Sequence, residues 1–400
     1  MLIVQKYGGT SVGNVERIEA VAKRVIETKK EGNDLIVVVS AMSGETNKLL
    51  EFAGYFSQNP NQREVDMLLS SGERVTSALL AIALNAMGYP TVSMSGRKAG
   101  IVTDSLHTKA RIEHIDTASM EKELKNGNII VLAGFQGVTE NGEVSTLGRG
   151  GSDLSAVAVA GALHADLCEI YTDVDGVYTT DPRIEPKAKK LDKISYDEML
   201  ELSSLGAKVL QSRSVEMAKK LNVNLVTRSS FNNNEGTLIT KEDNIMEQPL
   251  VSGIALDKNQ ARVTLRGVTD KPGIAAEIFK KLADANVNVD MIIQNVGHDG
   301  TTNLGFTVPQ NELDLTKKAM SELRASDVVE YDSDIVKVSI VGVGMKSHSG
   351  VACTAFDTMA KEGINIEMIS TSEIKVSMVI QAKYGELAVR TLHNAYQLDK

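Results

Sequence analysis

The stretch KYGGTSVG, residues 6–13, holds the first residues of the chain with evident chemistry. It joins a lysine to two adjacent glycines and two hydroxyl side chains, after the apolar run 2–4 and before apolar residues at helical spacing from Ile18. This pattern predicts a turn from a strand into a helix. Such a turn directs unpaired backbone N–H groups and the positive end of a helix at one point, and glycines let an anion come close. The turn therefore suits phosphate, although a tight connection with Thr10 or Ser11 as helix N-cap explains the same residues.

Four more polar clusters interrupt the first half of the chain. They are Ser40 with SGETNK (43–48), SSGER (70–74), GFQG (134–137) and TLGRGGSDLSA (146–156). The first and third follow apolar runs typical of strands, whereas the second and fourth are expected to open helices. Open α/β sheets bind ligands beyond the carboxyl ends of their strands. We therefore expect these clusters to share one cleft.

The segment TDVDGVYTTDPR (172–183) follows another strand-like run and contains three aspartates. Carboxylates beside a glycine turn suit magnesium. The DxDG pattern also begins a calcium-binding loop, but Ile184 stands where that loop has its twelfth-position glutamate. The chain has no GxxxxGK(S/T) motif, and GRGGSD does not fit GxGxxG. Neither a P-loop ATPase nor a dinucleotide-dependent enzyme is directly supported.

The elements that must position these residues alternate between two patterns up to about residue 240. Continuous apolar runs typical of strands occupy 35–41, 128–134, 169–173 and 224–228, and helical patterns occupy 74–87 and 152–165. Alternation of this kind predicts a parallel sheet covered by helices on both faces. The charged segment KEDNIMEQPLVSG (241–253) is expected to be a linker.

Beyond the linker the chain nearly repeats itself. Residues 262–292 resemble residues 337–369 at one constant offset, with Gly273 matching Gly350 and Asn288 matching Asn365 among others, and the first strands need a two-residue gap. Each copy predicts a strand, a glycine turn, an amphipathic helix and a strand. A unit of this size buries too little apolar surface alone, so the two are expected to pair. A coincidence between two generic βαβ units is the alternative.

Composition sets the broad class of protein. The 400 residues are 42% hydrophobic and 24% charged, with a net charge of −9 and a pI near 5.4. These values fit a globular protein of two or three domains and argue against a nucleic-acid partner. We expect no membrane-spanning stretch and no secretory signal, and hence a cytoplasmic protein. Cys168 and Cys353 are expected to be small buried residues, and the histidines, such as His107, show no metal-ligand spacing.

KYGGTSVG, SGER, GFQG, GRGGSDLSA and TDVDGVYTTDPR, in this order, resemble the motifs of aspartate kinases in the amino-acid kinase superfamily. The C-terminal repeats resemble the ACT regulatory domains of that family, so the resemblance covers nearly the whole chain. It implies an α/β fold: a three-layer αβα sandwich with a mainly parallel sheet, plus two ferredoxin-like βαββαβ ACT domains. Because the chain ends after the second repeat, it resembles the monofunctional type and not the fusions with homoserine dehydrogenase.

The resemblance divides the chain into domains. We expect the kinase domain at 1–245, a linker at 246–262, the first ACT domain at 263–334 and the second at 335–400. An alternative assigns the strand that begins at Val251 to the second ACT module, which would then be discontinuous.

The activity that the resemblance implies is ATP-dependent phosphorylation of the β-carboxylate of L-aspartate to 4-phospho-L-aspartate, the first step of lysine, threonine and methionine biosynthesis. A carboxylate with a pKa near 3.9 needs no general base, so the protein must supply cations and oriented donors. The implied catalytic residues are Lys6, Asp153 and Lys208. The implied ATP-binding residues are Lys6, Tyr7, Gly8, Gly9, Ser40, Thr172, Asp173, Tyr178, Asp181, Arg183 and Lys208. No residue is directly assigned to Mg²⁺, which the ATP phosphates are expected to hold.

For the substrate, Arg149 is expected to hold the α-carboxylate with two parallel hydrogen bonds, and Glu73 to pair with the α-ammonium group. The full substrate set implied is Thr10, Thr46, Glu73, Phe135, Arg149, Gly150, Gly151 and Ser152. Taken alone, Arg149 also fits a surface arginine and Glu73 a helix-entry carboxylate. Asp153 also fits a helix N-cap or first-turn carboxylate, and Lys208 a solvated lysine.

The repeats imply feedback inhibition by lysine, threonine or both, without indicating which. The expected effector residues are Asp270, Gly273, Ile274, Ala275, Asn288, Gln294, Asn365 and Ile366. Binding would favour one of two arrangements of the enzyme. The expected assembly is a homo-oligomer formed through the ACT domains, with or without a separate regulatory subunit. The alternative is that the repeats only dimerise the chain.

Three rival functions stay open at this point. Another superfamily member, such as a glutamate 5-kinase, is disfavoured by Glu73, Arg149 and the paired repeats. A catalytically silent amino-acid sensor is disfavoured by the intact Lys6, Asp153 and Lys208. An oxidoreductase lacks its glycine fingerprint.

Overall fold

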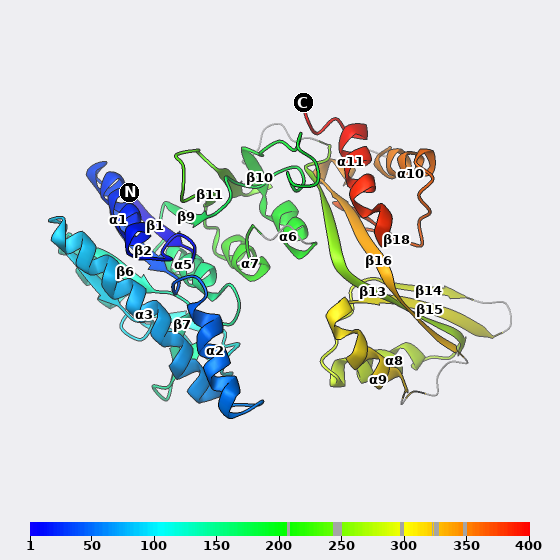
Figure 1. Cartoon of the computed structure of the whole chain (residues 1–400), viewed down its shortest axis with the longest axis horizontal. Helices are drawn as coiled ribbons and strands as arrows, with labels where there is room; N and C mark the ends of the chain where they lie inside the picture. The colour runs from blue at the N-terminus through cyan, green and yellow to red at the C-terminus, as the bar shows by residue number, and fades with distance from the viewer. Residues whose placement is uncertain (206–208, 243–249, 297–299, 322, 324–327, 347–349) are drawn as a thin grey trace. The chain divides into compact units, whose positions relative to one another are not determined.

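The structure is a computed structural model of the chain, and it describes residues 1–205, 209–242, 250–296, 300–321, 323, 328–346 and 350–400 (Figure 1). The chain divides into two compact units. Unit 1 comprises Met1–Val177, Lys190–Ser203 and 209–242. Unit 2 comprises Tyr178–Lys189, 204–205 and the described residues from 250 onward.

An eight-stranded sheet forms the centre of unit 1, in the order β10-β12-β11-β9-β1-β2-β6-β3. Its strands are β1 (Leu2–Tyr7), β2 (Asp34–Val39), β3 (Thr91–Met94), β6 (Ile129–Ala133), β9 (Leu167–Thr172), β10 (Lys193–Ser195), β11 (Leu225–Ser229) and β12 (Thr237–Thr240). Neighbouring strands run parallel except β11 and β12. The predicted mainly parallel sheet is confirmed.

Helices cover both faces of this sheet. The helices of unit 1 are α1 (Val15–Lys30), α2 (Glu45–Phe56), α3 (Gln62–Ala86), α4 (Ala118–Lys125), α5 (Gly151–Ala162), α6 (Tyr196–Ser204) and α7 (Ser212–Leu221). α1 and α3 pack with β2 and share one buried core, whereas α5 packs with β1 and β9 and carries α7. The αβα layering is therefore confirmed, and it follows from strands that are apolar on both faces.

The helix after KYGGTSVG begins one turn later than the sequence suggests. Asn14 is its N-cap, and the Asn14 side chain accepts a hydrogen bond from the backbone N–H of Arg17. The alternative with Thr10 or Ser11 as the cap is therefore wrong. Both residues lie in the turn itself, which leaves their hydroxyl groups outside the helix.

α3 begins well before the segment that was expected to open it. Asn61 caps the helix by accepting the N–H groups of Arg63 and Glu64, and SSGER lies in its middle. α3 is also the one described helix long and apolar enough to span a bilayer, contrary to our expectation of none, but half of that stretch is buried. The buried side chains include Asp66 and Glu73, as in a core helix of a folded domain.

A smaller sheet lies beside α3 and α5. Its order is β5 (Ile112–Ile115), β4 (Ile101–Thr103), β7 (Gln136–Thr139) and β8 (Val144–Thr146). β7 follows β6 along the chain, and β8 leads directly into α5. This sheet therefore positions the GFQG and GRGGSD motifs.

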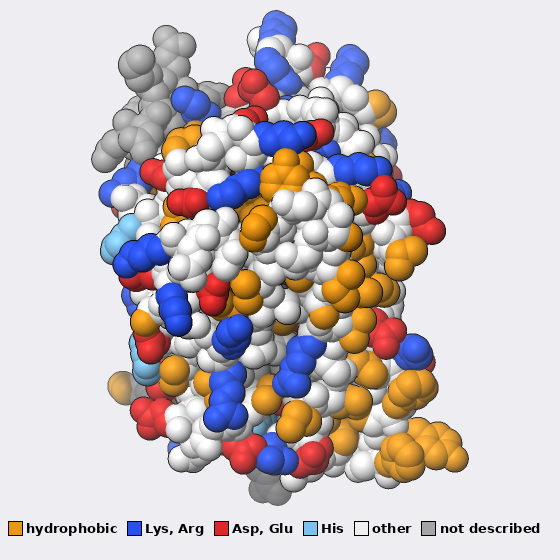
Figure 2. Space-filling model, turned by 90° about the vertical axis from the view of Figure 1, so that its left-hand side faces the viewer, with side chains coloured by type: hydrophobic (Ala, Val, Ile, Leu, Met, Phe, Trp, Pro, Cys, Tyr) orange, Lys and Arg blue, Asp and Glu red, His pale blue; other side chains and the backbone are white. Residues whose placement is uncertain are grey.

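α2 has no buried residue and exposes several aromatic side chains. Phe52, Tyr55 and Phe56 are 54%, 86% and 85% exposed. Figure 2, which shows the left-hand side of Figure 1, has hydrophobic side chains gathered in places between Lys and Arg side chains. α2 therefore contributes little to the core of unit 1.

Unit 2 is built on one six-stranded antiparallel sheet, in the order β14-β15-β13-β16-β18-β17. The strands are β13 (Gly253–Thr269), β14 (Ile292–Val296), β15 (Thr301–Val308), β16 (Val328–Val341), β17 (Met368–Thr371) and β18 (Lys375–Gln381). The helices are α8 (Ile274–Asp284), α9 (Leu313–Ser321), α10 (Val351–Lys361) and α11 (Gly385–Ala395), with short 3₁₀ turns at Gln310–Glu312, Val343–Lys346 and Ala382–Tyr384.

Two hydrophobic cores divide unit 2 into two modules. One core combines α8 and α9 with the second half of β13. The other combines α10 and α11 with Val251 and Ile254, because the first half of β13 pairs with the end of β16. The C-terminal module thus takes one strand from the chain that precedes the first module. Much of the expected linker 241–253 lies outside the described residues.

The two cysteines differ in their exposure to solvent. Cys168 is buried in β9, where burial raises the pKa of its thiol well above the usual range. Cys353 is exposed near the start of α10, so the expectation that it is buried is wrong. The apolar residues around Cys353 in the sequence face the core at helical spacing, and Cys353 lies on the other side of the helix.

Candidate active site

The end of β1 places Lys6 beside an acidic residue of α5. Lys6 is 8% exposed, and its Nζ lies 2.6 Å from Asp153 Oδ1. Asp153 is 9% exposed and stands in the first turn of α5, where the positive end of the helix favours a carboxylate. Among the described residues, Asp153 Oδ1 has no partner in hydrogen-bond geometry, so its contact with Lys6 is an ion pair.

The two glycines of the turn are needed because other chain segments come close. The N–H of Gly8 donates to Tyr171 O in β9 at 3.3 Å. A Cβ on Gly9 would lie 3.0 Å from Ala41 O, just after β2. Bare backbone at the ends of β1, β2 and β9 therefore converges near Lys6, as a phosphate-binding turn requires.

Glu73 lies next to the same end of β2. It is 3% exposed, and its Oε1 accepts the backbone N–H of Ala41 at 3.1 Å. Among the described residues, Glu73 Oε2 is buried without a hydrogen-bond partner. Burial raises the pKa of Glu73 to about 7, against the lowering effect of the Ala41 hydrogen bond. A buried carboxylate oxygen with no partner is suited to an incoming cation.

The GFQG segment, which follows β6, packs closely against the GRGGSD segment. Phe135 has a left-handed φ of 68°, and its N–H donates to Ser155 Oγ at 3.0 Å. A Cβ on Gly134 would lie 2.9 Å from Ser152, and one on Gly151 would lie 2.8 Å from the Phe135 ring. These glycines bring the start of α5 and its backbone N–H groups to the carboxyl end of the sheet.

Arg149 is exposed between two glycines in left-handed conformation. Gly148 has a φ of 78° and Gly150 a φ of 72°. Thr46 is half-buried in the first turn of α2, and Thr10 is exposed in the β1–α1 turn. The described geometry places all of these substrate candidates in unit 1.

The expected nucleotide set is divided between the two units. Thr172 and Asp173 stand at the end of β9 in unit 1, where Thr172 O accepts the N–H of Ser230 at 2.9 Å. Ser40 follows β2, and its N–H donates to Tyr7 O at 3.1 Å. Tyr178, Asp181 and Arg183 belong to the segment Tyr178–Lys189 of unit 2. Lys208 lies outside the described residues.

Asp181 and Arg183 form an ion pair with each other. Arg183 Nε and Nη2 donate to the Asp181 carboxylate at 3.0 and 2.8 Å, and this guanidinium lowers the pKa of Asp181. Thr179 anchors the same segment within unit 2, because its O accepts the N–H of Ile254 at 2.7 Å. The position of this segment therefore depends on the C-terminal module.

The effector candidates gather around two matching segments of unit 2. Asn288 donates its N–H and Nδ2 to Glu312 at 2.8 and 3.1 Å, and Gly273, with a φ of 95°, precedes α8. The remaining candidates lie in the same two modules: Asp270, Ile274, Ala275 and Gln294 in the first, and Asn365 and Ile366 in the second. The two segments meet, because Met291 and Met368 share one buried cluster.

Sequence reasoning missed several groups that shape the site. They are Asp66, Ser155, the hydroxyl of Thr76, which donates to Ser40 O at 2.8 Å, and the backbone N–H of Ala41. Ser155 lies within a motif that was singled out, three residues after Ser152, so its spacing along α5 was a usable signal. A backbone N–H carries no such signal.

Comparison with known proteins identifies the parts of the chain. Residues 1–228 match the amino acid kinase family, and residues 263–326 and 338–396 each match an ACT domain. An aspartokinase of Helicobacter pylori J99 is 62% identical over 405 residues, which cover 100% of both chains.

Two solved structures of E. coli aspartokinase III have the same architecture. The complex with aspartate and ADP, called R-state, is 26% identical, with a TM-score of 0.81 and coverage of 99% of each chain. The complex with lysine and aspartate, called T-state, is 27% identical, with a TM-score of 0.78 and coverage of 98% of this chain and 99% of that one. The resemblance in sequence motifs therefore extends to the whole fold.

Proposed function

The chain belongs to the amino acid kinase family, as an aspartokinase with two ACT domains, and on this premise we propose how its residues act. The reaction transfers the terminal phosphoryl group of ATP to the β-carboxylate of L-aspartate and forms 4-phospho-L-aspartate. This product starts the biosynthesis of lysine, threonine and methionine. The observation that carries the assignment of residues is the buried pair of Lys6 and Asp153 beside the Gly8–Gly9 turn.

Lys6 neutralises charge as the phosphoryl group is transferred. An aspartate carboxylate is ionised at neutral pH, so the difficulty is repulsion between two anions and not removal of a proton. Asp153 keeps the Lys6 ammonium group, which lies 2.6 Å away, in place at the start of α5. The N-terminus of α5 and the backbone of Gly9 add oriented N–H groups that cost no reorganisation during the reaction, whereas the Gly8 N–H is already bound to Tyr171 O.

The nucleotide lies along the ends of β1, β2 and β9 in this proposal. Ser40, Thr172 and Asp173 lie at that edge of the sheet, which is where open α/β sheets bind ligands. The Tyr7 ring is buried in the core, so Tyr7 can contribute only its backbone there. The phosphate oxygens would hold Mg²⁺, and Asp153, whose buried Oδ1 has no hydrogen-bond partner among the described residues, is a carboxylate that suits this ion. The ion would supply further positive charge to the phosphates.

Glu73 and Arg149 select an amino acid. Glu73 Oε2 lacks a partner among the described residues and accepts the α-ammonium group, which satisfies a buried charge that is otherwise left alone. Arg149 binds the α-carboxylate in the bidentate geometry that a lysine cannot reproduce. Thr46, Phe135 and Ser152 complete the pocket. A plain dicarboxylate lacks the ammonium group and is expected to bind poorly.

Unit 2 regulates the kinase by binding lysine, threonine or both. Asn288 and Asn365 stand in segments that meet through Met291 and Met368, so an effector held by either segment acts on a shared cluster. In this proposal the kinase domain ends near 245 and the ACT domains span 263–334 and 335–400, and the strand that begins at Gly253 is assigned to the second ACT domain. The proposal includes a homo-oligomer formed through the ACT domains and a cytoplasmic location.

The experiment that tests this proposal measures aspartyl hydroxamate formed from ATP, L-aspartate and Mg²⁺ in the presence of hydroxylamine. Lys6→Ala is expected to lower kcat by at least about a hundredfold, the scale seen when one charge-stabilising group is removed. Asp153→Asn is expected to lower kcat less, because the Lys6 charge remains but is no longer held in place. Addition of lysine or threonine is expected to lower the wild-type rate.

Each result has a clear meaning. Absence of hydroxamate from folded wild-type protein that binds L-aspartate would favour the silent amino-acid sensor. Equal turnover by Lys6→Ala would remove Lys6 from the proposed mechanism. Wild-type turnover that ignores both amino acids would reduce the ACT modules to a dimerisation device.

A further inference from the structure

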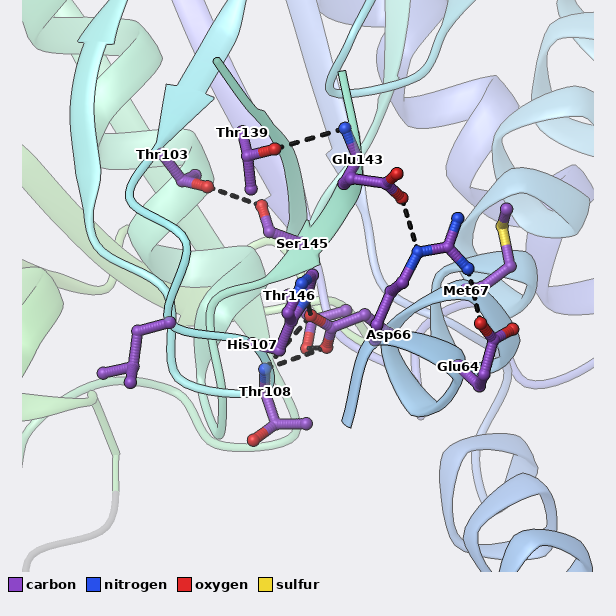
Figure 3. Close-up of polar contacts among 12 residues, drawn as sticks. Glu64, Asp66, Met67, Thr103, His107, Thr108, Thr139, Glu143, Ser145 and Thr146 are labelled. Atoms are coloured by element: carbon purple, nitrogen blue, oxygen red, sulfur yellow. Dashed lines mark hydrogen bonds and ion pairs between the residues drawn. The ribbon is translucent and has the colours of Figure 1, made fainter. Parts of the chain in front are cut away.

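Asp66 is a fully buried carboxylate that the proposed mechanism does not use. It lies on α3 two turns before Glu73, and seven residues return to the same face of a helix. Its Oδ2 lies 2.7 Å from His107 Nδ1, and its two oxygens lie 3.0 and 3.1 Å from the backbone N of Thr108. The hydroxyl of Thr146 donates to its Oδ1. Figure 3 shows these groups converging on the one carboxylate.

Two of these partners come from a strained loop. Thr108 has a φ of 66°, a left-handed conformation that a β-branched residue adopts only where its surroundings impose it. The Asp66 carboxylate holds the Thr108 N–H in this conformation. The carbonyl oxygen of Thr108 in turn lies 3.2 Å from the point where a Cβ on Gly148 would stand. The loop 104–110 thus forms a wall against the backbone next to Arg149.

The third partner, Thr146, stands three residues before Arg149 at the end of β8. Its carbonyl oxygen accepts the N–H of Ala110 at 2.9 Å, and the next carbonyl, that of Leu147, accepts Arg213 Nη1 at 2.7 Å. On the other side of Arg149, a Cβ on Gly150 would overlap the Gln211 side chain. The backbone that carries Arg149 is therefore fixed from both sides, while the Arg149 side chain remains exposed.

We propose that Asp66 is a positioning residue for the α-carboxylate site: it fixes the loop that carries Arg149 by binding Thr146, Thr108 and His107. This inference rests on the proposed role of Arg149 in binding L-aspartate. An ionised carboxylate offers only acceptors, and here it faces two donors from the protein and one ring nitrogen. An amide in its place keeps one acceptor oxygen, so the Thr108 N–H loses one of its two acceptors and His107 Nδ1 has to accept a hydrogen bond from the amide.

Ser145 provides a matched comparison on the same strand. It is fully buried next to Thr146, and its hydroxyl lies 2.6 Å from Thr103 Oγ1, away from Asp66 (Figure 3). Because side chains alternate between the two faces of a strand, Ser145→Ala removes a buried hydrogen bond from β8 without touching the Asp66 cluster. Thr146→Val has nearly the shape of the native side chain and removes only the hydroxyl that reaches Asp66.

The test compares the wild type with Asp66→Asn, Thr146→Val, Arg149→Ala and Ser145→Ala. Calorimetry gives the Kd of the full-length protein for L-aspartate and for its α-amide, which lacks the α-carboxylate charge. Loss of one buried hydrogen bond corresponds to a factor of about ten. Asp66→Asn and Thr146→Val are expected to weaken aspartate binding by about tenfold and to reduce the preference for aspartate over the amide. Ser145→Ala is expected to keep the wild-type preference.

The preference ratio distinguishes positioning from a structural role alone. Thermal unfolding shows which variants fold, and Thr146→Val keeps the test decisive if Asp66→Asn does not. A wild-type preference ratio in Thr146→Val overturns the proposal, as does an equal loss in Ser145→Ala, which would indicate general loosening of β8. An unchanged ratio in Arg149→Ala overturns the premise about Arg149 itself, and this outcome is separate from any failure of hydroxamate formation.

Discussion

Glu73 Oε1 accepts the backbone N–H of Ala41 at 3.1 Å, and this hydrogen bond ties a buried carboxylate of α3 to the end of β2. The same carboxylate has a pKa of about 7, which burial raises from an ordinary value of 4.5. Glu73 therefore changes charge near neutral pH, in a position where it is proposed to bind the α-ammonium group of L-aspartate.

We predict that kcat/KM for L-aspartate falls below about pH 7, by about tenfold per pH unit at the limit, because protonated Glu73 cannot pair with the ammonium group. Glu73→Gln should lower kcat/KM at pH 8 and abolish this dependence. Glu64→Gln, an exposed change on the same helix, is the control. A wild-type profile that is flat from pH 8 to 6 would contradict the assignment.

Stability should change with pH in the opposite direction. Since the folded-state pKa of Glu73 lies above its unfolded value, the native state binds more protons between about pH 4.5 and 7. The contribution of Glu73 to the free energy of unfolding is therefore largest at low pH and is lost as the pH rises through 7. We expect Glu73→Gln to raise the melting temperature at pH 8 more than at pH 5. Differential scanning calorimetry at both pH values checks this expectation.

The close approach of α3 to β2 predicts a second pair of variants. A Cβ on Gly72 would lie 2.8 Å from the Cβ of Ala41, whereas one on Gly54 in α2 meets nothing within 4 Å. Gly72→Ala should destabilise the protein by about 1–3 kcal/mol, as overpacking does, and raise KM for aspartate by displacing Ala41. Gly54→Ala should be neutral or stabilise by up to about 1 kcal/mol. Urea unfolding followed by circular dichroism, with hydroxamate kinetics, distinguishes the two, and equal effects would contradict the packing argument.

The sequence patterns worked best where burial is complete on both faces of a strand. β1, β2, β6, β9 and β11 all appear as continuous apolar runs, and each was predicted. The short strands β4 and β5 were missed, because β4 has only three residues and β5 (IEHI) has two adjacent polar residues in place of a strand-like alternation. SSGER was misplaced since its polar residues suggested a helix start, whereas α3 already begins at the Asn61 cap.

The sequence also predicted only part of the candidate site. The motifs led to Lys6, Asp153 and Glu73, whose roles were expected from the family resemblance. Asp66 could not be assigned, since the groups that surround it come from residues 41, 42 and 80 positions away along the chain. The strained φ of Thr108 likewise leaves no mark in residue type, because threonine is not a residue that usually adopts it.

The burial of His393 in α11 predicts how the stability of unit 2 changes at low pH. It is fully buried, its Nε2 lies 2.9 Å from Thr179 Oγ1, and burial lowers its pKa below the ordinary 6.5. The native state therefore binds fewer protons than the unfolded state, so the contribution of His393 to stability is lost as the pH falls below about 6.5.

His393→Gln should flatten the decrease in urea midpoint between pH 6.5 and 5, since glutamine can bind Thr179 without taking up a proton. His164→Asn is the control: His164 is exposed with a φ of 51°, which asparagine tolerates. Identical pH dependence in the wild type and His393→Gln would show that other groups govern acid sensitivity.

Gly273 and Gly350 occupy matching positions before α8 and α10. Substitutions at these two positions distinguish the effect of backbone conformation from that of the space around an added Cβ. Neither has any atom within 4 Å of an added Cβ, but Gly273 has a φ of 95° and Gly350 a φ of −92°. An alanine at Gly273 is therefore strained by about 1–2 kcal/mol, whereas one at Gly350 is not.

If the turn before α8 holds the effector, Gly273→Ala should raise the lysine or threonine concentration for half-inhibition by about five- to thirtyfold and leave the uninhibited kcat unchanged. Gly350→Ala should be inhibited by the same effector concentration as the wild type. Equal inhibition curves for the two variants, with both folded by circular dichroism, would place the effector away from the first glycine turn.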